Sequence, residues 1–235
     1  MIPMAEKIDE KTYNGHKVVG VVLRSQAKTL HFLRHAEGTH NEAALKEGRA
    51  AYAKIEHLDA RLTDLGKQQC ATLKATNHGV EKEAELVVVS PLTRAIETAM
   101  LTIDQARISP FHDDVEGVPW VALGCVRERT GGHPCDRRRC VSELKKDYPT
   151  ISFDAMKDED DAYFDSLGDE RESNERVADR ARELFAWLKD RPETNIAVVT
   201  HSAFLLCLFN EAVLSPPDVA KWFENCELRT VMMDL

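Results

Sequence analysis

Three short runs of apolar residues, each bounded by polar positions, stand out along the chain. Each run is rich in Val, Ile or Leu and lacks the strict alternation of a strand with one face in water. We interpret them as buried parallel strands over residues 28–33, 85–89 and 195–199. Two weaker runs, at 18–23 and 118–121, are further strand candidates.

Apolar residues recur at helical spacing between these runs. One helix is expected to begin at an N-cap, Thr63, and to end before residue 77. A second is expected after residue 90, with Ser90 as its N-cap and Pro91 at its first position. Further helices are expected over 175–188, ending before Pro192, and over 202–213.

Strands that alternate with helices predict a parallel sheet covered on both faces, an α/β architecture. The 235 residues, 43% of them hydrophobic, suit a single domain over 1–235, with 1–17 as a peripheral N-terminal segment. The acid-rich stretch 154–172 is expected to be a surface excursion. Its expected anchors are Tyr163, Phe164 and Leu167.

Charge and hydropathy exclude several classes of protein. The formal net charge of −9 leaves no basic surplus for nucleic-acid phosphates, so we expect no nucleic-acid partner. No apolar stretch approaches the roughly 18 residues of a membrane span, so we expect no membrane partner. The first residues lack the basic-then-apolar order of a secretory signal. We therefore expect a soluble cytoplasmic protein.

The six cysteines are scattered and include no C-x-x-C pair, which favours reduced thiols over a disulfide framework. The cluster His133, Cys135 and Cys140 raises the alternative of a zinc site, because thiolates and imidazole bind zinc. Its spacing matches no standard zinc finger, so the expectation is a loop with ordinary thiols. We predict neither a metal nor another cofactor.

Polar residues follow each of the three predicted strands. In an open α/β sheet, ligands bind beyond the carboxyl ends of the strands. Arg34 and His35 follow the first strand, Arg94 lies one helical turn after the second, and His201 follows the third. Arginine's fork of donors matches phosphate oxygens. Two Arg and two His converging on one edge of an acidic protein therefore indicate a phosphate site.

Two common ways of handling phosphate are absent from the sequence. There is no G-x-x-x-x-G-K-[ST] loop, which excludes a P-loop kinase, and no C-x5-R loop of a cysteine phosphatase. A neutral histidine can itself attack phosphorus and form a covalent intermediate, while arginines neutralise the oxygens of the transferring group.

Four motifs in order resemble the histidine phosphatase superfamily, in its phosphoglycerate-mutase-like branch, between roughly residues 29 and 210. They are L-R-H-A-E-x-x-x-N from Leu33, L-T-x-x-G-x-x-Q from Leu62, S-P-L-x-R-A from Ser90 and V-V-T-H-S from Val198. The H-P-C-D-x-R stretch from His133 is similar to that of plant and fungal phosphoglycerate-mutase-like proteins. The resemblance implies a three-layer α/β/α sandwich with a mostly parallel central sheet.

The resemblance also implies a role for each matching residue. His35 is the nucleophile that becomes phosphohistidine, and Arg34, Arg94 and His201 hold the phosphoryl oxygens. Asn41, in the loop after His35, adds a hydrogen bond to the substrate.

A proton donor is needed as well, because an alkoxide leaves poorly unless it is protonated. Ser202 stands where one branch of the family has an Asp after the second histidine. The mutase-like branch uses a Glu in an R-E context, and Glu128 fits that pattern. The alternative for Glu128 is an exposed carboxylate paired with Arg127 or Arg129.

The arginine run at 137–139 and the residue His40 each have two possible interpretations. The run Arg137, Arg138, Arg139 is the densest positive run of the chain, and is either a second anionic contact for the substrate, with Arg138 as the candidate, or a solvated turn. His40 contacts either substrate or solvent.

The expected function is a metal-independent phosphatase of small phosphorylated metabolites. The alternatives are a phosphomutase of the phosphoglycerate type and a phospholigand-binding relative without catalysis. The retained residue types at all five catalytic positions disfavour the last. Neither the physiological substrate nor the oligomeric state follows from the sequence.

Overall fold

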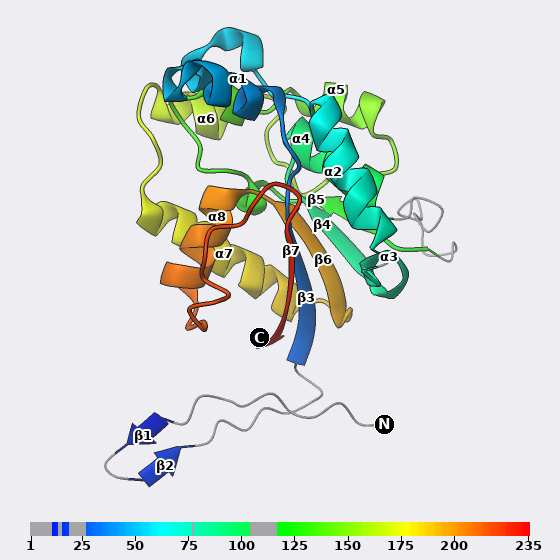
Figure 1. Cartoon of the computed structure of the whole chain (residues 1–235), viewed down its shortest axis with the longest axis vertical. Helices are drawn as coiled ribbons and strands as arrows, with labels where there is room; N and C mark the ends of the chain where they lie inside the picture. The colour runs from blue at the N-terminus through cyan, green and yellow to red at the C-terminus, as the bar shows by residue number, and fades with distance from the viewer. Residues whose placement is uncertain (1–10, 14–15, 19–26, 77, 104–116) are drawn as a thin grey trace.

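The computed structural model describes residues 11–13, 16–18, 27–76, 78–103 and 117–235 (Figure 1). Strands β1 (Lys11–Tyr13) and β2 (His16–Val18) pair antiparallel in a small sheet of their own. The strand candidate at 18–23 lies almost wholly outside the described residues. Within these ranges, no helix combines the length and the apolar character needed to cross a bilayer.

A five-stranded sheet forms the centre of the protein, with the strand order β5-β4-β6-β3-β7 (Figure 1). The first four of these strands pair parallel, which confirms the three predicted strands and the weaker candidate at 118–121. Their bounds are β3 (Ala27–Arg34), β4 (Leu86–Val89), β5 (Trp120–Ala122) and β6 (Asn195–Thr200).

The edge strand β7 (Leu228–Asp234) was not predicted and runs antiparallel to β3. Its residues alternate between half-buried and exposed, so no apolar run marks it in the sequence. The sheet is therefore mostly parallel with one antiparallel edge.

The structure contains α-helices and, between them, shorter helices of the 3-10 and π types. The α-helices are α1 (Thr39–Glu47), α2 (Asp64–Ala75), α3 (Val80–Glu83), α4 (Thr93–Thr102), α5 (Val141–Asp147), α6 (Ala162–Leu167), α7 (Asn174–Lys189) and α8 (Ser202–Cys207). The short 3-10 helices are η1 (Arg49–Ala53), η2 (Ile55–His57), η4 (Gly124–Val126) and η5 (Pro134–Asp136), and the π-helix η6 (Leu208–Ala212) continues α8.

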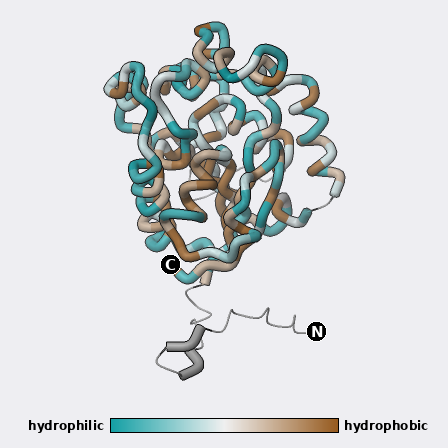
Figure 2. Tube along the Cα trace, turned by 60° about the vertical axis from the view of Figure 1, so that its left-hand side comes forward, coloured by the Kyte–Doolittle hydropathy of each residue, from teal (hydrophilic) through white to brown (hydrophobic). Residues whose placement is uncertain are grey.

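Alternate residues of each central strand enter two separate hydrophobic cores. On β6, Ala197 and Val199 join the core under α2 and α4, whereas Ile196 and Val198 join the core under α7 and α8. Successive side chains of a strand point to opposite faces, so this sheet is buried on both sides. Figure 2 shows the hydrophobic strands in the middle, under more hydrophilic helices. The three-layer α/β/α sandwich is confirmed.

Two predicted helix caps have different outcomes. Thr63 caps α2 as expected, because its side chain accepts a hydrogen bond from the Gly66 backbone N–H. The predicted cap at Ser90 is wrong, since α4 begins at Thr93 after Leu92. The Ser90 hydroxyl hydrogen-bonds His201 at 2.7 Å instead.

Candidate active site

The carboxyl ends of β3, β6 and β4 lie level with one another, and this places the predicted residues together. The His35 backbone N–H donates to Thr200 O at 2.9 Å, and that of Ser90 donates to Val199 O at 3.0 Å. The residues that follow the three strands therefore emerge at one edge of the sheet. β6 lies between β4 and β3, so His201 emerges between the other two.

The ring of His35 has a defined tautomer in its neutral form. Its Nδ1 lies 2.7 Å from the backbone oxygen of Ala36. A carbonyl can only accept, so Nδ1 carries the hydrogen and Nε2 keeps its lone pair. His35 lines a cavity, which makes Nε2 the nitrogen available for chemistry.

The surroundings of His35 hold its ring neutral. Burial lowers the pKa of His35 well below the usual value, and the charges of Arg94 and Arg34 lower it further. Burial and Arg94 act on the pKa values of His201 and His40 in the same direction. All three imidazoles are therefore uncharged at neutral pH, as nucleophilic attack by a histidine requires.

Arg34 and Arg94 are both buried, and each donates hydrogen bonds within the protein. Arg34 donates to the backbone oxygen of Phe223 at 2.7 Å. Arg94 is fully buried in the first turn of α4 and forms an ion pair with Asp136 at 2.9 Å. Asp136 also pairs with Arg171 at 2.7 Å, so one carboxylate orients two guanidiniums.

Several buried nitrogens around this edge lack any hydrogen-bond partner. A buried polar nitrogen without a partner costs free energy. A guanidinium Nε can only donate, whereas an imidazole Nδ1 donates in one tautomer and accepts in the other. With Nε2 of His201 bonded to the Ser90 hydroxyl, the Nδ1 of that ring is one such atom. The set comprises Nε of Arg34, Nδ1 of His40, Nε of Arg94 and Nδ1 of His201.

Glu128 lines the same cavity as His35 and lies against the start of α8. Its Oε1 accepts from the backbone N–H of Phe204 at 3.2 Å, and its Oε2 from that of Ala203 at 3.4 Å. The Thr200 hydroxyl donates to Val126 O at 2.5 Å and so ties the segment before Glu128 to the end of β6. The alternative of an exposed Glu paired with Arg127 or Arg129 is wrong: no ion pair joins them, and Glu128 lines the cavity.

The loop after His35 is shaped by two of the sequence motifs. Asn41 lines the cavity, and its side-chain oxygen accepts from the Gly38 backbone N–H at 3.0 Å. A Cβ at Gly66 would lie 2.2 Å from the backbone oxygen of Glu37, so only glycine lets α2 approach this loop. Thr63 and Gly66 therefore position the loop that leads into α1. Asn41 lies in the first turn of that helix, not in the loop as predicted.

The cavity at this edge has a volume of about 370 Å³, and most of the predicted site residues line it. It brings together Arg34, His35, Asn41, Arg94 and Glu128. His201 is fully buried and does not line the cavity, but its ring packs beside that of His35. The His35 and His201 ring centroids lie 5.0 Å apart.

Comparison with known proteins agrees with this geometry. The family model described as "Histidine phosphatase superfamily (branch 1)" matches residues 30–234. The chain belongs to the histidine phosphatase superfamily. A phosphoglycerate mutase-like protein of Arabidopsis thaliana is 34% identical over 240 residues, which cover 92% of this chain and 88% of that protein. Phosphoglycerate mutase-like protein 1 of the same plant is 33% identical, covering 92% and 84%.

Solved structures show the same fold. A putative alpha-ribazole-5'-P phosphatase of Escherichia coli superposes with a TM-score of 0.53 at 20% identity, covering 86% of this chain and 89% of that one. The mixed sheet and its helical layers therefore form the same fold as that structure.

One residue predicted for the site lies outside it. Arg138 does not line the cavity of the histidine phosphatase site but a second hollow of about 660 Å³ beside α6 and α7. Its guanidinium donates to the backbone oxygens of Asp158, Glu159 and Asp160. The prediction that Arg138 contacts the substrate is therefore wrong. Its side chain holds the backbone of residues 158–160 instead. Its neighbours Arg137 and Arg139 pair with Asp165 and with Asp59.

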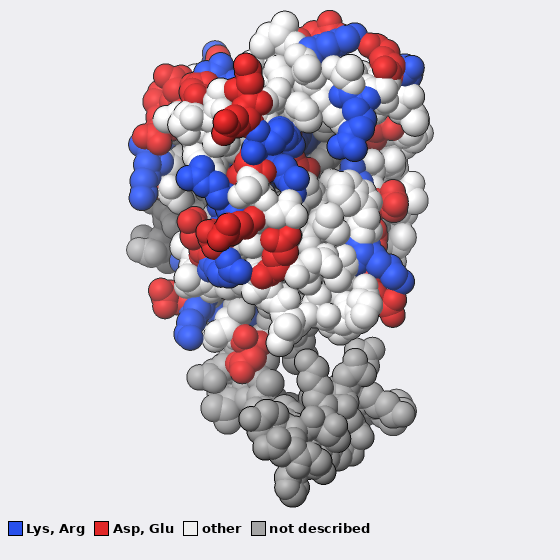
Figure 3. Space-filling view, turned by 90° about the vertical axis from the view of Figure 1, so that its left-hand side faces the viewer, with Lys and Arg blue, Asp and Glu red and all other residues white. Residues whose placement is uncertain are grey.

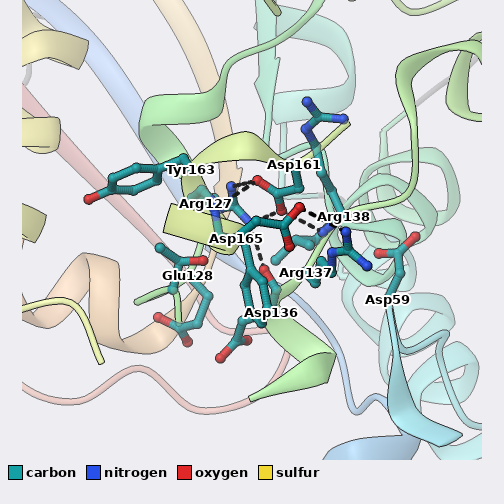
Figure 4. A network of polar contacts seen from close by, with 12 residues as sticks. Asp59, Arg127, Glu128, Asp136, Arg137, Arg138, Asp161, Tyr163 and Asp165 are labelled. Atoms are coloured by element: carbon teal, nitrogen blue, oxygen red, sulfur yellow. Dashed lines mark hydrogen bonds and ion pairs between the residues drawn. The ribbon is translucent and has the colours of Figure 1, made fainter. Parts of the chain in front are cut away.

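The stretch 154–172 is anchored mainly by two buried carboxylates, Asp161 and Glu172 (Figure 4). The expected anchors Tyr163, Phe164 and Leu167 are half-buried, and the Tyr163 hydroxyl donates to Glu172 at 2.7 Å. Asp161 accepts from both terminal nitrogens of Arg127, and both side chains are almost fully buried. Glu172 pairs with Arg180 at 2.6 Å. Arg180 also donates to the backbone oxygens of Arg127 and Glu128. These contacts fix the chain segment that presents Glu128.

Sequence reasoning missed the residues that complete the cavity. Asp136 belongs to the H-P-C-D-x-R stretch, but a single sequence does not show that it orients Arg94. The others are Arg49, Tyr52, His133, Arg171 and Trp222. His40, left without a role, lines the cavity and is 4% exposed. No group of three or more His, Cys, Asp or Glu side chains in the described ranges is placed to hold a metal ion.

Proposed function

We propose that this histidine phosphatase superfamily member hydrolyses small phosphomonoesters through a phosphohistidine intermediate. The observation that carries the proposal is the neutral His35 with a free Nε2, close to buried guanidinium and imidazole nitrogens that lack a hydrogen-bond partner. A phosphoryl group supplies the missing oxygens. Members of the family are phosphatases or mutases, which agrees with this chemistry.

The reaction takes two displacements at phosphorus. Nε2 of His35 attacks, the ester P–O bond breaks, and Glu128 gives its proton to the departing oxygen. Arg34, Arg94 and His201 hold the oxygens while charge develops on them. Water then attacks the phosphohistidine, the P–N bond to His35 breaks and phosphate leaves. The Glu128 carboxylate takes the water's proton, which restores both residues.

We favour hydrolysis of the phosphohistidine over transfer of its phosphoryl group back to the substrate, because water can enter the cavity. A mutase retains its intermediate in a pocket that excludes water. Here the cavity mouth includes the exposed Arg49 and Trp222, which is 48% exposed. The names of the plant relatives keep a phosphoglycerate-type mutase as the second candidate. Conversion of 3- to 2-phosphoglycerate, with and without a bisphosphorylated primer, tests it.

A small substrate also agrees with the charge pattern of the one face drawn in Figure 3. The face shown in Figure 3 carries Lys and Arg side chains mixed with Asp and Glu, not a continuous basic track. A polyanion would need such a track.

Substitution of the nucleophile tests the proposal. His35→Ala is expected to abolish phosphate release from p-nitrophenyl phosphate, whereas His78→Ala, outside the cavity, is expected to keep it. Rapid quenching of the wild type into alkali, where phosphohistidine survives, should leave about 80 Da on the peptide that contains His35. Turnover by His35→Ala, or a phosphate on another residue, overturns the assignment.

A further inference from the structure

The outer part of the cavity is not used by the chemistry described above. Its lining residues come from η1, from the loop before η5 and from the segment before β7. We call it the outer subsite, defined by Arg49, Tyr52, His133 and Trp222. A cavity of about 370 Å³ holds more than one phosphoryl group, so this part faces the leaving group.

A row of rings connects the nucleophile with the outer subsite. The ring centroids of His35 and His40 lie 5.7 Å apart, and those of His40 and Tyr52 5.8 Å. Tyr52 stacks on His133 at 5.5 Å. These distances are typical of packed aromatic pairs, so the row forms one continuous wall from the floor to the mouth.

The arginines of the cavity differ in how they are held. Arg94 and Arg171 share the carboxylate of Asp136, and Arg34 donates to a backbone oxygen. Arg49 lines the cavity without any hydrogen bond or ion pair to the described residues. It nevertheless lies close enough to His133 to lower the pKa of that ring, after burial and Arg171.

The positive charges of the residues that line the cavity exceed the negative charges of these residues and of a bound phosphoryl group by one. Four guanidiniums, those of Arg34, Arg49, Arg94 and Arg171, face the carboxylates of Glu128 and Asp136. Glu128 must be protonated to act as the acid, which leaves three positive charges in excess. A dianionic phosphoryl group neutralises two of them. The remaining charge is on Arg49, at the mouth.

We propose that Arg49 is a specificity-determining residue that pairs with a further anionic group on the leaving group of the substrate. The preferred substrates are then phosphomonoesters whose alcohol or phenol carries a carboxylate or a second phosphate. The run Arg137 to Arg139, the sequence's other candidate for this contact, is occupied elsewhere. The proposal rests on the hydrolysis proposed above.

Matched substrates test the proposal on the full chain. Phenyl phosphate, 4-carboxyphenyl phosphate and 1,4-phenylene bisphosphate share a ring and differ in the second group. The measured quantity is the ratio of kcat/KM for each anionic substrate to that for phenyl phosphate. Arg49→Gln is expected to lower at least one of these ratios about fivefold, and the carboxylate and phosphate arms show which group is recognised.

Two further variants make the result specific. Arg49→Lys should restore most of the ratio, because it keeps the charge. Arg137→Gln, which removes an exposed guanidinium outside the cavity, should leave the ratio at the wild-type value. Unchanged ratios in Arg49→Gln, with phenyl phosphate hydrolysed by the wild type, overturn the role of Arg49 alone. No hydrolysis of any of the three by the wild type overturns the proposed function instead.

Discussion

Nε2 of His201 and the hydroxyl of Ser90 share a hydrogen bond of 2.7 Å between two side chains that are fully buried. The residues are far apart in sequence but follow neighbouring strands, β6 and β4. The bond fixes the plane of the imidazole, and the Ser90 backbone N–H is itself held by Val199 O. Ser90 therefore acts as a positioning residue for His201.

Ser90→Ala is expected to weaken both the fold and the reaction. It leaves both nitrogens of the buried His201 ring without a partner, because Nδ1 already lacks one. The free energy of unfolding should fall by about 1–3 kcal/mol, and kcat/KM by about ten- to hundredfold. Urea unfolding and phosphatase kinetics measure the two effects. Ser166→Ala, at an exposed position, is the control, and an active Ser90→Ala with wild-type kinetics contradicts the positioning role.

Stability is expected to fall as the pH drops below about 6.5. His35, His40 and His201 have pKa values well below 6.5 in the folded chain, so only the unfolded chain takes up protons on them as the pH falls through 6.5. The contribution of each histidine to the free energy of unfolding is complete above that pH. Below it, the free energy of unfolding falls by up to about 1.4 kcal/mol per pH unit for each histidine. Urea unfolding at pH 7.5, 6.5 and 5.5 measures the slope.

His40→Gln separates this effect from that of the carboxylates. The variant should show a shallower slope between pH 6.5 and 5.5, because one titrating imidazole is gone. Buried carboxylates such as Asp161 and Glu172 have lowered pKa values and act at more acidic pH. Stability that is flat over this range in the wild type contradicts neutral buried imidazoles.

Asp161→Asn is expected to be the most destabilising single substitution in the network of Figure 4. It leaves the guanidinium of Arg127 buried without its counter-charge, which costs about 3–5 kcal/mol. Asp165→Asn breaks the half-exposed pair with Arg137 and should cost less than about 1 kcal/mol. Thermal and urea unfolding compare the two, and equal losses would show that burial of the pair is not the cause.

The sequence predicts the centre of the fold and the floor of the site for one physical reason. Strands buried on both faces are mostly apolar, so β3, β4 and β6 are visible as runs even though β3 also buries Lys28 and His31. The residues just after a strand must leave the sheet at its carboxyl edge. His35, Arg94 and His201 can therefore be placed without any knowledge of the surrounding loops.

The remaining parts depend on contacts between segments distant in sequence. Whether Arg138 faces substrate or backbone is decided by the oxygens of Asp158 to Asp160, and nothing local marks them. Ser90 has the residue type of a cap, but His201 competes for its hydroxyl. Arg49 and Tyr52 reach the cavity through η1, which has neither strand nor helix periodicity.

Glu128→Gln distinguishes a general acid from a residue that only shapes the pocket. The amide keeps one oxygen for the backbone N–H groups of Phe204 and Arg129, which Oε1 of Glu128 accepts, and gives up the weaker acceptance from Ala203 on Oε2. It cannot protonate a leaving group. An alkyl phosphate such as glycerol phosphate should lose about 10²- to 10³-fold in kcat, because alkoxide needs that proton.

p-Nitrophenyl phosphate should lose much less in the first step, since p-nitrophenolate leaves without a proton. Burst kinetics with this ester should then reveal phosphohistidine accumulating, as the second step still requires a base to activate water. Glu175→Gln, on the exposed start of α7, is the matched control. An equal loss for both esters, with no accumulated intermediate, would assign Glu128 to the shape of the pocket and leave the proton donor to another residue.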